Sequence, residues 1–562
     1  MASSLRLSLF AVIALCLASC GVTENISDTF KNVFDGKRKT LATQRLSVFD
    51  YENALRGGIA GKMIGAAYGA SVIAQPNVAP SDVVLPAWNP DWTTRALESE
   101  TILPSITLFE AMQAKGISIS PTEAALIFAR TPHSYTGGNQ AVQQNIRAGI
   151  MPPDSGRPKY NPFADSPHFQ NNIDILAMLS PGMPQTAIRL IQPYGEAFAY
   201  ADGVYGANFI AAMLATAMMN DDVAAVVESG RASLPPDSRY AQMVRAVVDF
   251  HRANPNDWAA CARMVMERGG GNSESAAQIG GYVALSLLYG KGDFEMTLYL
   301  SSRCGRGDPR PSASACGVLG AVLGYGRLPE AFASGVTRYA NAAFLFKGHS
   351  LNSLVSASVD QAQLVIERRG GTKQTLGQRE YFSVPIETAY TPDRRVTFDR
   401  GGFEAEWATL DTRRADQFFA RVQKELNQWQ PDWTLLNCGG QIYAGRWDEY
   451  EGRDNVFVTA PVSREVPARM TRSVAVPGGS PKLTVIAGAS NLAQNTGWIL
   501  RVFVNDQVEF EKAVIGEKHQ ANWQEFKIDL SKYAGQTVTL ALENGTSVWD
   551  LSTAYWARVD IK

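Results

Sequence analysis

Cysteine is scarce in this 562-residue chain, which contains six cysteines at wide and irregular intervals. Disulfide-rich scaffolds and structural zinc sites both depend on close, regular cysteine spacings. The pattern therefore argues against a disulfide framework and against a zinc site. An excess of positive charge is lacking as well, because the net charge is -2 and no basic stripe runs along the sequence. This balance gives no reason to expect a nucleic acid as a partner.

The apolar run near the N-terminus, Leu7 to Leu17, falls short of the roughly 20 residues that a membrane-spanning helix needs. It follows Arg6 and ends in Leu17-Ala18-Ser19-Cys20, which looks like a bacterial lipobox. The resemblance implies cleavage before Cys20 and attachment of lipid to it, where each buried CH₂ group contributes about 0.8 kcal/mol to anchoring. We therefore expect a lipoprotein signal peptide (residues 1–19), a polar tether (20–47) and a location in the cell envelope, on the periplasmic or surface side of a membrane. The alternative is a plain signal peptide, which would also export the protein.

The chain is longer than one hydrophobic core usually serves, so we expect at least two domains. Helical periodicity dominates from Tyr51 to about Gly371, and no strand pattern of comparable strength interrupts it. We predict one all-α domain over residues 48–371. Its first helix holds glycines at 57, 58, 61, 65 and 69, where each costs a helix about 1 kcal/mol relative to alanine. They indicate close approach to another helix or to a ligand.

The helical periodicity of the sequence ends after residue 371. Residues 372–432 are polar and predict a linker with one short helix. From residue 433 to 562, short alternating runs are separated by turns at the spacing of a β-sandwich. The predicted fold is therefore multidomain, with an all-α bundle followed by an all-β jelly-roll sandwich.

Three loop-rich stretches of the helical region are candidates for a functional site. A long insert runs from His133 to Pro184, and loops of this length inside a compact domain are usually functional. A turn from Tyr200 to Asn208 places polar groups in an apolar setting. The stretch Ser301 to Gly326 is a tight polar segment followed by a helix of small residues, which can aim a site inward.

The helical part resembles the ADP-ribosylglycohydrolase family from about Tyr51 to Gly371. The similarity is carried by the glycine-rich first helix, the acidic segment Glu98-Ser99-Glu100-Thr101, the turn that begins at Tyr200, and the segment from Arg303 to Pro309 with its small-residue helix. The insert looks like that of exported family members. The resemblance implies an all-α bundle whose cleft holds two divalent ions, usually Mg²⁺, and hydrolysis of a glycosidic bond at the anomeric carbon of ADP-ribose.

The resemblance also implies roles for individual residues, because hard cations need oxygen ligands and an acid can serve as general base for water. Glu98, Glu100 and Asp308 are the candidate catalytic residues. Candidate metal ligands are Glu98, Ser99, Glu100, Thr101 and Asp308. Candidate substrate-binding residues are Asn145, Asp202, Tyr205 and Arg306. We expect the early acidic segment and Asp308 to meet across one pocket.

The sequence departs from the family pattern at the metal site. Ser99 stands where members have an acid, and alignment of the flanking cysteines puts Gly307 and Pro309 on the two late aspartates, with Asp308 between them. Arg306 and Arg310 disfavour a cation, since two like unit charges about 4 Å apart repel by several kcal/mol at an effective dielectric near 20. The same arginines suit a phosphate or carboxylate of a ligand. These departures predict a partly degenerate metal site.

The C-terminal part resembles galactose-binding-like β-sandwiches, through the segment that starts at Trp523 and the closing strand that starts at Tyr555. Trp447, Trp549 and His519 lie near predicted turns and are candidates for stacking on a sugar ring. A structural cap on the helical domain is the alternative role.

Three functions fit these observations. The first is a surface-anchored, ADP-ribosylglycohydrolase-like hydrolase acting on an ADP-ribose-like or glycan ligand. The second is a non-catalytic envelope protein that binds a nucleotide or glycan in the same cleft. The third is a glycosidase, which would need two carboxylates roughly 5–9.5 Å apart.

Overall fold

The computed structural model describes residues 41–270, 274–390, 401–440, 442–492, 496–517, 522–546 and 552–562. Internal contacts divide the chain into Met1–Gln44 and Arg45–Lys562, and the fold below is that of the second unit. The predicted signal peptide with Cys20, and the candidate ring-stacking residues Trp549 and His519, lie outside the described residues. In the part of the chain that is described, no helix has the length and apolar character needed to cross a membrane.

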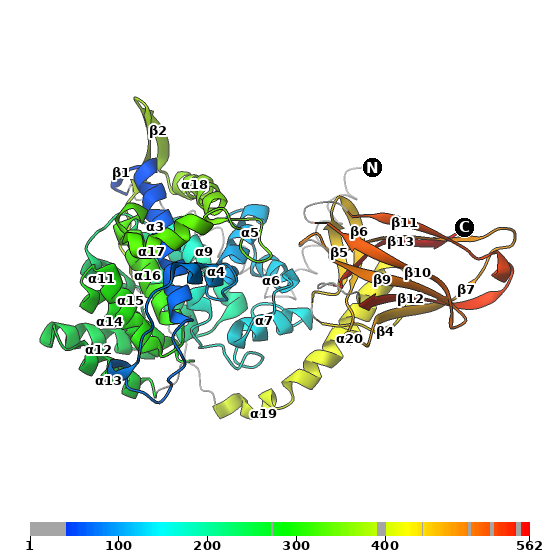
Figure 1. Ribbon diagram of the computed structural model, residues 1–562, viewed down its shortest axis with the longest axis horizontal. Helices are drawn as coiled ribbons and strands as arrows, with labels where there is room; N and C mark the ends of the chain where they lie inside the picture. The colour runs from blue at the N-terminus through cyan, green and yellow to red at the C-terminus, as the bar shows by residue number, and fades with distance from the viewer. Residues whose placement is uncertain are drawn as a thin grey trace, which may run out of the picture. The chain divides into compact units, whose positions relative to one another are not determined.

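Helices fill the chain from Val48 to Arg368, and the strands β4 to β13 follow later in the chain (Figure 1). The helices are α3 (Val48–Gly69), α4 (Thr93–Ala96), α5 (Leu103–Lys115), α6 (Pro121–Arg130), α7 (Gly137–Arg147), α8 (Asp174–Met178), α9 (Pro184–Phe198), α10 (Asp202–Ala217), α11 (Val223–Ala232), α12 (Arg239–Ala253), α13 (Trp258–Arg268), α14 (Ala276–Gly290), α15 (Phe294–Gly305), α16 (Arg310–Leu323), α17 (Glu330–Tyr339), α18 (Leu351–Arg368), α19 (Glu404–Trp407) and α20 (Leu410–Trp429). Short 3₁₀ turns are η1 (Pro80–Asp82), η2 (Pro90–Trp92), η3 (Asp154–Gly156), η4 (Phe169–Asn171), η5 (Tyr325–Arg327), η6 (Gly401–Phe403) and η7 (Ser531–Tyr533).

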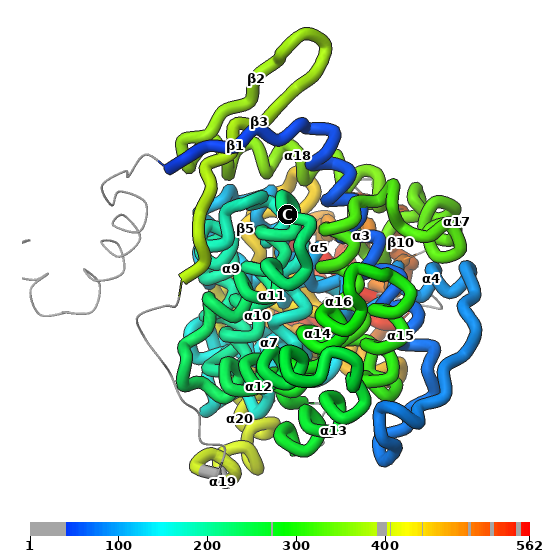
Figure 2. The backbone as a smooth tube through the Cα atoms, turned by 90° about the vertical axis from the view of Figure 1, so that its left-hand side faces the viewer, coloured from blue at the N-terminus to red at the C-terminus, as the bar shows by residue number. Residues whose placement is uncertain are grey.

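The centre of the helical domain is the contact between α3 and α16, with α14 and α15 alongside α16 (Figure 2). Glycines let the two backbones touch. A Cβ on Gly61 would lie 2.1 Å from the Cys316 carbonyl oxygen, and one on Gly65 would lie 2.2 Å from that of Ser312. The Ser312 hydroxyl donates a 2.8 Å hydrogen bond to the Gly65 carbonyl. The glycines of the first helix therefore serve helix–helix packing.

A β-hairpin follows α18, inside the segment expected to be a polar linker. It consists of β2 (Thr372–Leu376) and β3 (Arg379–Pro385), which pair antiparallel with Thr372 opposite Ser383. The short strand β1 (Thr43–Ser47) precedes α3, whose N-cap is Ser47. The short helix expected within residues 372–432 corresponds to α20.

The C-terminal part consists of two five-stranded antiparallel sheets, in the orders β10-β9-β12-β7-β4 and β11-β8-β13-β6-β5. The strands are β4 (Thr434–Asn437), β5 (Gly445–Tyr450), β6 (Arg453–Thr459), β7 (Ala468–Ala475), β8 (Lys482–Gly488), β9 (Thr496–Val504), β10 (Gln507–Gly516), β11 (Gln524–Asp529), β12 (Thr537–Thr546) and β13 (Ala554–Ile561). Buried residues of both sheets, including Val485 on β8 and Leu500 on β9, belong to one hydrophobic cluster. The predicted order of an all-α domain followed by an all-β part is confirmed.

Trp447 and Trp498 of the sheets and four cysteines of the described chain are buried. Trp498 is fully buried and its indole N–H donates to the Gly488 carbonyl, as expected for a core residue. Trp447 is also buried, and its indole donates to the Tyr443 carbonyl, so it does not present the open ring face expected for sugar stacking. Cys261, Cys304, Cys316 and Cys438 are buried free thiols.

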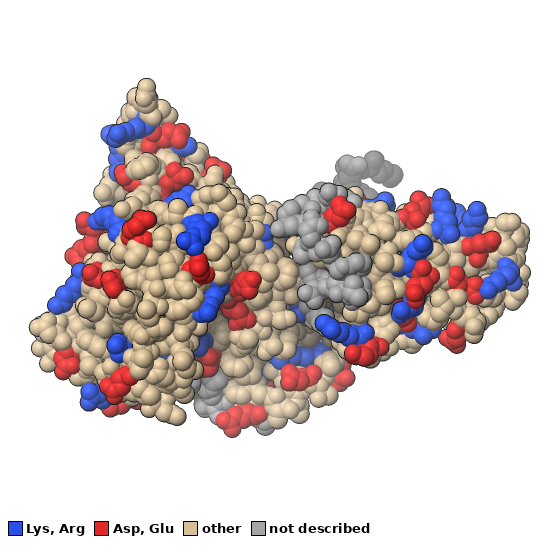
Figure 3. Space-filling model, viewed as in Figure 1, with Lys and Arg blue, Asp and Glu red and all other residues tan. Residues whose placement is uncertain are grey.

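The surface agrees with the balanced charge of the sequence. On the face drawn in Figure 3, Lys and Arg side chains are interspersed with Asp and Glu.

The α3–α16 contact gives a prediction for stability. We expect Gly65→Ala to lower the free energy of unfolding by about 1 kcal/mol, because overpacking a tight contact typically costs about 1–3 kcal/mol and outweighs the gain of about 1 kcal/mol in helix propensity. Urea denaturation followed by circular dichroism measures the change. The control is Gly348→Ala, because a Cβ at Gly348 meets no atom within 4 Å. Equal stabilities of the two variants would contradict the role of the glycines.

Candidate functional site

A pocket of about 680 Å³ lies within the helical domain, where several loops converge. Its walls come from the loop after α3, the segment before α5, the start of α7, the long insert, the residue Glu274 before α14, and the turn between α15 and α16. Residues on these walls include Ser99, Glu100, Thr101, Thr136, Asn139, Phe163, His168, Asn171, Asn172, Glu274, Arg306, Asp308 and Arg310. Residues Ser99, Glu100 and Thr101 of the early acidic segment thus line the same pocket as Asp308, as expected from the sequence.

The turn that carries Asp308 is built by local backbone constraints. Helix α15 ends at Gly305, and Arg306 follows with a left-handed backbone (φ 53°). Gly307 has φ 102°, and a Cβ there would lie 2.7 Å from the Ala74 Cα, so the position requires glycine. The Asp308 carboxylate then accepts a 2.9 Å hydrogen bond from the Arg310 backbone N–H. Asp308 therefore both shapes the start of α16 and lines the pocket.

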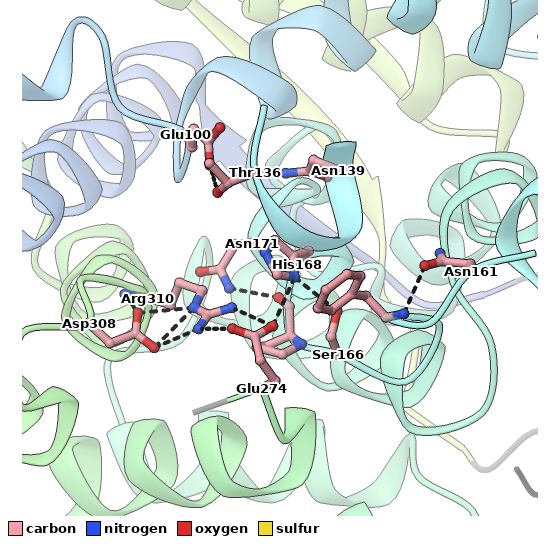
Figure 4. Close-up of polar contacts among 12 residues, drawn as sticks. Glu100, Thr136, Asn139, Asn161, Ser166, His168, Asn171, Glu274, Asp308 and Arg310 are labelled. Atoms are coloured by element: carbon pink, nitrogen blue, oxygen red, sulfur yellow. Dashed lines mark hydrogen bonds and ion pairs between the residues drawn. The ribbon is translucent and has the colours of Figure 1, made fainter. Parts of the chain in front are cut away.

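Arg310 connects two carboxylates on one side of the pocket (Figure 4). Its Nε lies 3.0 Å from each carboxylate oxygen of Asp308, and its Nη2 lies 2.9 Å from Oδ2 of Asp308. The same Nη2 lies 2.9 Å from Oε1 of Glu274. The Arg310 side chain is only 12% exposed, and although burial opposes it, the charges of Asp308 and Glu274 raise the pKa of the guanidinium. A permanent cation therefore lies between two acids, in the kind of paired geometry that arginine favours.

His168 adds a neutral ring to this side of the pocket. Its Nδ1 lies 2.9 Å from the Ser166 hydroxyl and 3.5 Å from Oε2 of Glu274. Burial, together with the charge of Arg310, lowers the pKa of the imidazole to about 4. The ring is therefore uncharged at neutral pH.

Glu100 lies on the opposite side of the close-up, next to Thr136 (Figure 4). Its Oε2 accepts a 2.5 Å hydrogen bond from the Thr136 hydroxyl. Burial raises the pKa of the Glu100 carboxyl, and the Thr136 hydrogen bond and the charge of Arg310 oppose this effect only in part. Glu100 therefore holds a proton to higher pH than an exposed glutamate does, which suits a proton donor.

Side-chain amides complete the pocket, and buried contacts hold them in place. The side-chain Nδ2 of Asn172 donates a 2.7 Å hydrogen bond to the side-chain Oδ1 of Asn139. The Asn171 side chain accepts from the Ser314 hydroxyl, and its backbone carbonyl accepts from Nζ of Lys62. Lys62 itself is buried on α3 in an ion pair of 2.5 Å with Asp174. The central helix thus fixes the wall that the insert contributes.

Four of the candidate residues lie elsewhere. Glu98 is exposed on the turn after α4 and does not line the pocket, because the tight turn directs it outward while Ser99 and Thr101 hydrogen-bond to each other. Asn145 is fully buried and donates to the carbonyls of Ser155 and Tyr160, so it supports the insert from within.

Asp202 and Tyr205 begin α10 at a distance from the pocket lining. Oδ2 of Asp202 accepts a 2.9 Å hydrogen bond from Nε of Arg239 on α12, which holds the start of α10. Tyr205 lines a second cavity, of about 570 Å³, with Tyr200 and Val204. The structure therefore does not bring these two residues to the pocket with Glu100.

The family model for ADP-ribosylglycohydrolase matches residues 47–368, which is more than half of the chain. The chain belongs to the ADP-ribosylglycohydrolase family. Among solved structures, an "ADP-ribosylglycohydrolase-related protein complex" is similar at 14% identity and a TM-score of 0.39, over 56% of this chain and 99% of that chain. The K3 adhesin domain of Lys-gingipain from Porphyromonas gingivalis is similar at 11% identity and a TM-score of 0.18, over 23% of this chain and 90% of that chain. No curated protein matches the chain.

The pair of divalent ions implied by the resemblance to ADP-ribosylglycohydrolases does not fit the residues of this pocket. Both oxygens of Asp308 and one oxygen of Glu274 already lie about 3 Å from Arg310 nitrogens. Ser99 supplies a hydroxyl in place of an acid, and Gly307 has no donor side chain. Across the described residues, no group of three or more His, Cys, Asp or Glu side chains is arranged to hold a metal ion. Two cations beside a fixed guanidinium would also be repelled by it.

The neutral His168 ring predicts a pH dependence of stability. Its pKa falls from a usual 6.5 in the unfolded chain to about 4 in the fold, so the unfolded chain binds more protons between these values. The stability due to the neutral ring is therefore complete above about pH 6.5 and declines by up to about 3 kcal/mol as the pH falls to 4, at about 1.4 kcal/mol per pKa unit. His168→Gln should flatten this decline in urea unfolding curves.

The matched control for this prediction is His251→Gln, because His251 lies on α12 and does not line the pocket. It should leave the His168-dependent part of the decline in place. Parallel stability curves for the wild type and His168→Gln would contradict the prediction.

Proposed function

We propose that this protein is an exported, lipid-anchored hydrolase that cleaves a glycosidic bond of an ADP-ribosyl group or a related glycoside. Family membership supports the reaction class. One observation carries the proposal: Glu100, whose carboxyl has a raised pKa, lines the same pocket as the ion cluster of Asp308, Arg310 and Glu274. Most glycosidases use two carboxyl groups whose environments give them different pKa values, one as the acid and one as the base or nucleophile.

In this proposal, Glu100 is the general acid. Its carboxyl gives a proton to the leaving atom as the bond from that atom to the anomeric carbon breaks. The oxygen of a water molecule forms the new bond to that carbon, and the carboxylate of Glu274 takes the proton that the water loses. Glu274 suits this role better than Asp308, because its side chain is 31% exposed and that of Asp308 is 12% exposed. Asp308 holds Arg310 in position.

The second candidate function is binding without catalysis, of a nucleotide or a glycan, in the same pocket. The observation that favours it is the loss of acids from the family pattern at Ser99 and Gly307, together with the tie between Arg310 and the acids that remain. Both candidates share the pocket and differ in turnover.

The C-terminal sheets, in this proposal, form a galactose-binding-like β-sandwich that either holds glycan or caps the helical domain. Support comes from the sequence likeness around Trp523 and Tyr555, and from the two antiparallel sheets that share a hydrophobic cluster.

Hydrolysis can be tested on the purified full chain with ADP-ribosylated arginine, ADP-ribosylated serine peptides and a set of p-nitrophenyl glycosides. We expect turnover that persists in EDTA, because the pocket does not fit divalent ions. Glu100→Gln should lower kcat at least 100-fold, in line with the usual contribution of general acid catalysis. The control is Glu330→Gln, an exposed glutamate at the start of α17. Ligand binding without any turnover would favour the second candidate function. Turnover that EDTA abolishes would contradict the proposal that the reaction needs no divalent metal.

Anchoring can be tested in the producing cell. Cys20→Ala should move the protein from the membrane fraction to the soluble fraction and abolish labelling by an alkyne-tagged palmitate, because the thiol that receives lipid is gone. Unlabelled wild-type protein that still sediments with membranes would argue against a lipoprotein.

A further inference from the structure

The charges on the pocket walls narrow the class of substrate. The ionisable side chains of the lining are three carboxylates, on Glu100, Glu274 and Asp308, and two guanidiniums, on Arg306 and Arg310, together with a His168 ring that is neutral near pH 7. Their formal sum is -1 when all three acids are ionised. The pocket thus carries no excess positive charge.

Arg310 is paired with acids of the pocket wall, and Arg306 is largely buried. Arg310 spreads its hydrogen bonds over Asp308 and Glu274, which neutralise it. Arg306 is 8% exposed, and its Nη1 donates a 2.6 Å hydrogen bond to the Pro76 carbonyl and contacts the Met266 sulfur. Its Nε is buried and has no hydrogen-bond partner among the described residues. Arg306 lines the pocket, and the expectation that it binds a phosphate stays a prediction.

A diphosphate carries about two negative charges near pH 7, and in this pocket it would lose water beside the carboxylates of Glu274 and Asp308. Burying a charge is unfavourable unless a partner of opposite sign is available. Divalent cations could supply that partner, but the donor set here does not fit them. A nucleotide diphosphate is therefore poorly matched to this pocket.

Neutral polyhydroxyl ligands match the remaining groups. The exposed hydroxyl of Thr136 and the partly exposed hydroxyl of Ser99 can donate to and accept from sugar hydroxyls. The amides of Asn139, Asn171 and Asn172 are buried behind them. The Phe163 ring is only half-buried and packs at the edge of His168, so it presents an apolar surface to the C–H face of a sugar. A small number of placed polar groups beside an aromatic ring is the usual composition of a selective small-molecule site.

We infer that the substrate of this pocket is an uncharged glycoside, and that Arg310 takes the place of the family's divalent cations by holding Asp308 and Glu274 side by side. This inference rests on the proposed function for the reaction, but it names the ligand class independently. Binding of a neutral sugar should depend little on ionic strength, because no net charge is exchanged.

The test compares ligands on the full wild-type chain, in EDTA. The neutral set consists of p-nitrophenyl pentosides and hexosides with the corresponding free sugars, and the anionic set consists of ADP-ribose and ADP-ribosyl-arginine. Isothermal titration calorimetry and saturation-transfer NMR measure binding, and chromophore or ADP-ribose release measures turnover. We expect at least one neutral ligand to bind ten-fold or more tightly than ADP-ribose, with little change between 50 and 500 mM NaCl, conditions that differ greatly in screening.

A charge-switch variant sharpens the test. Glu274→Gln removes one acid, so the formal sum of the lining becomes 0 and Arg310 loses one of its two acidic partners. This variant should gain affinity for ADP-ribose by about ten-fold, and the gain should disappear at 500 mM NaCl. Glu330→Gln is the control of equal charge change outside the pocket, and circular dichroism verifies folding.

The outcomes separate the inference from the proposed function. Tight, metal-free binding or cleavage of ADP-ribosyl ligands by the wild type would overturn the inference while leaving a hydrolase in place. Neutral sugars that bind without being cleaved would support the ligand class and overturn the hydrolase. A panel that is neither bound nor cleaved overturns both, and wild-type binding of Mg²⁺ or Mn²⁺ that Asp308→Asn removes would overturn the role of Arg310.

Discussion

The pairing of Arg310 with Asp308 and Glu274 is the interaction on which the pocket depends. Two carboxylates on one wall repel each other, and a guanidinium between them turns this repulsion into attraction. Removal of one member of such a partly buried set leaves a charge without its partner. This destabilises a fold more than replacement of the whole set by apolar residues does. The same ion pairs occupy carboxylate oxygens that a divalent cation would need as ligands.

The position of this ion cluster follows from backbone packing further inside. Glycines on α3 let α16 approach until carbonyls and Cα atoms touch, and this contact sets where α16 begins. Its first residue is Arg310, held over Asp308 by the turn at Gly307. The buried pair of Lys62 and Asp174 ties the opposite wall to the same helix. Helix α3 therefore positions both sides of the pocket, and its glycines make the close contact with α16 possible.

The sequence predicted the features that local pattern controls. Periodicity indicated a helical domain followed by strands, glycine spacing indicated close helix contact, and two distant motifs indicated that Glu100 and Asp308 share a pocket. It could not reveal Glu274 or His168, because neither lies in a motif and both reach the pocket only through tertiary folding. The sequence could not show that Asn145, Asp202 and Tyr205 lie outside the pocket. Polar residues in loops form hydrogen bonds with nearby backbone or side-chain groups as readily as with ligands. Arg310 was recognised as unfavourable for metal, but its two acidic partners depended on the fold.

The four buried thiols have a consequence for the export that is proposed above. Burial raises the pKa of the Cys438 thiol to about 11 and that of Cys261 to about 12, and it raises the pKa of Cys304 and Cys316 as well. A thiol that stays protonated reacts slowly with oxidants and with disulfides. In the folded chain, these four thiols would therefore react slowly in an oxidising compartment. Burial protects them only while the chain is folded, so the proposed export exposes them to cross-linking until folding is complete.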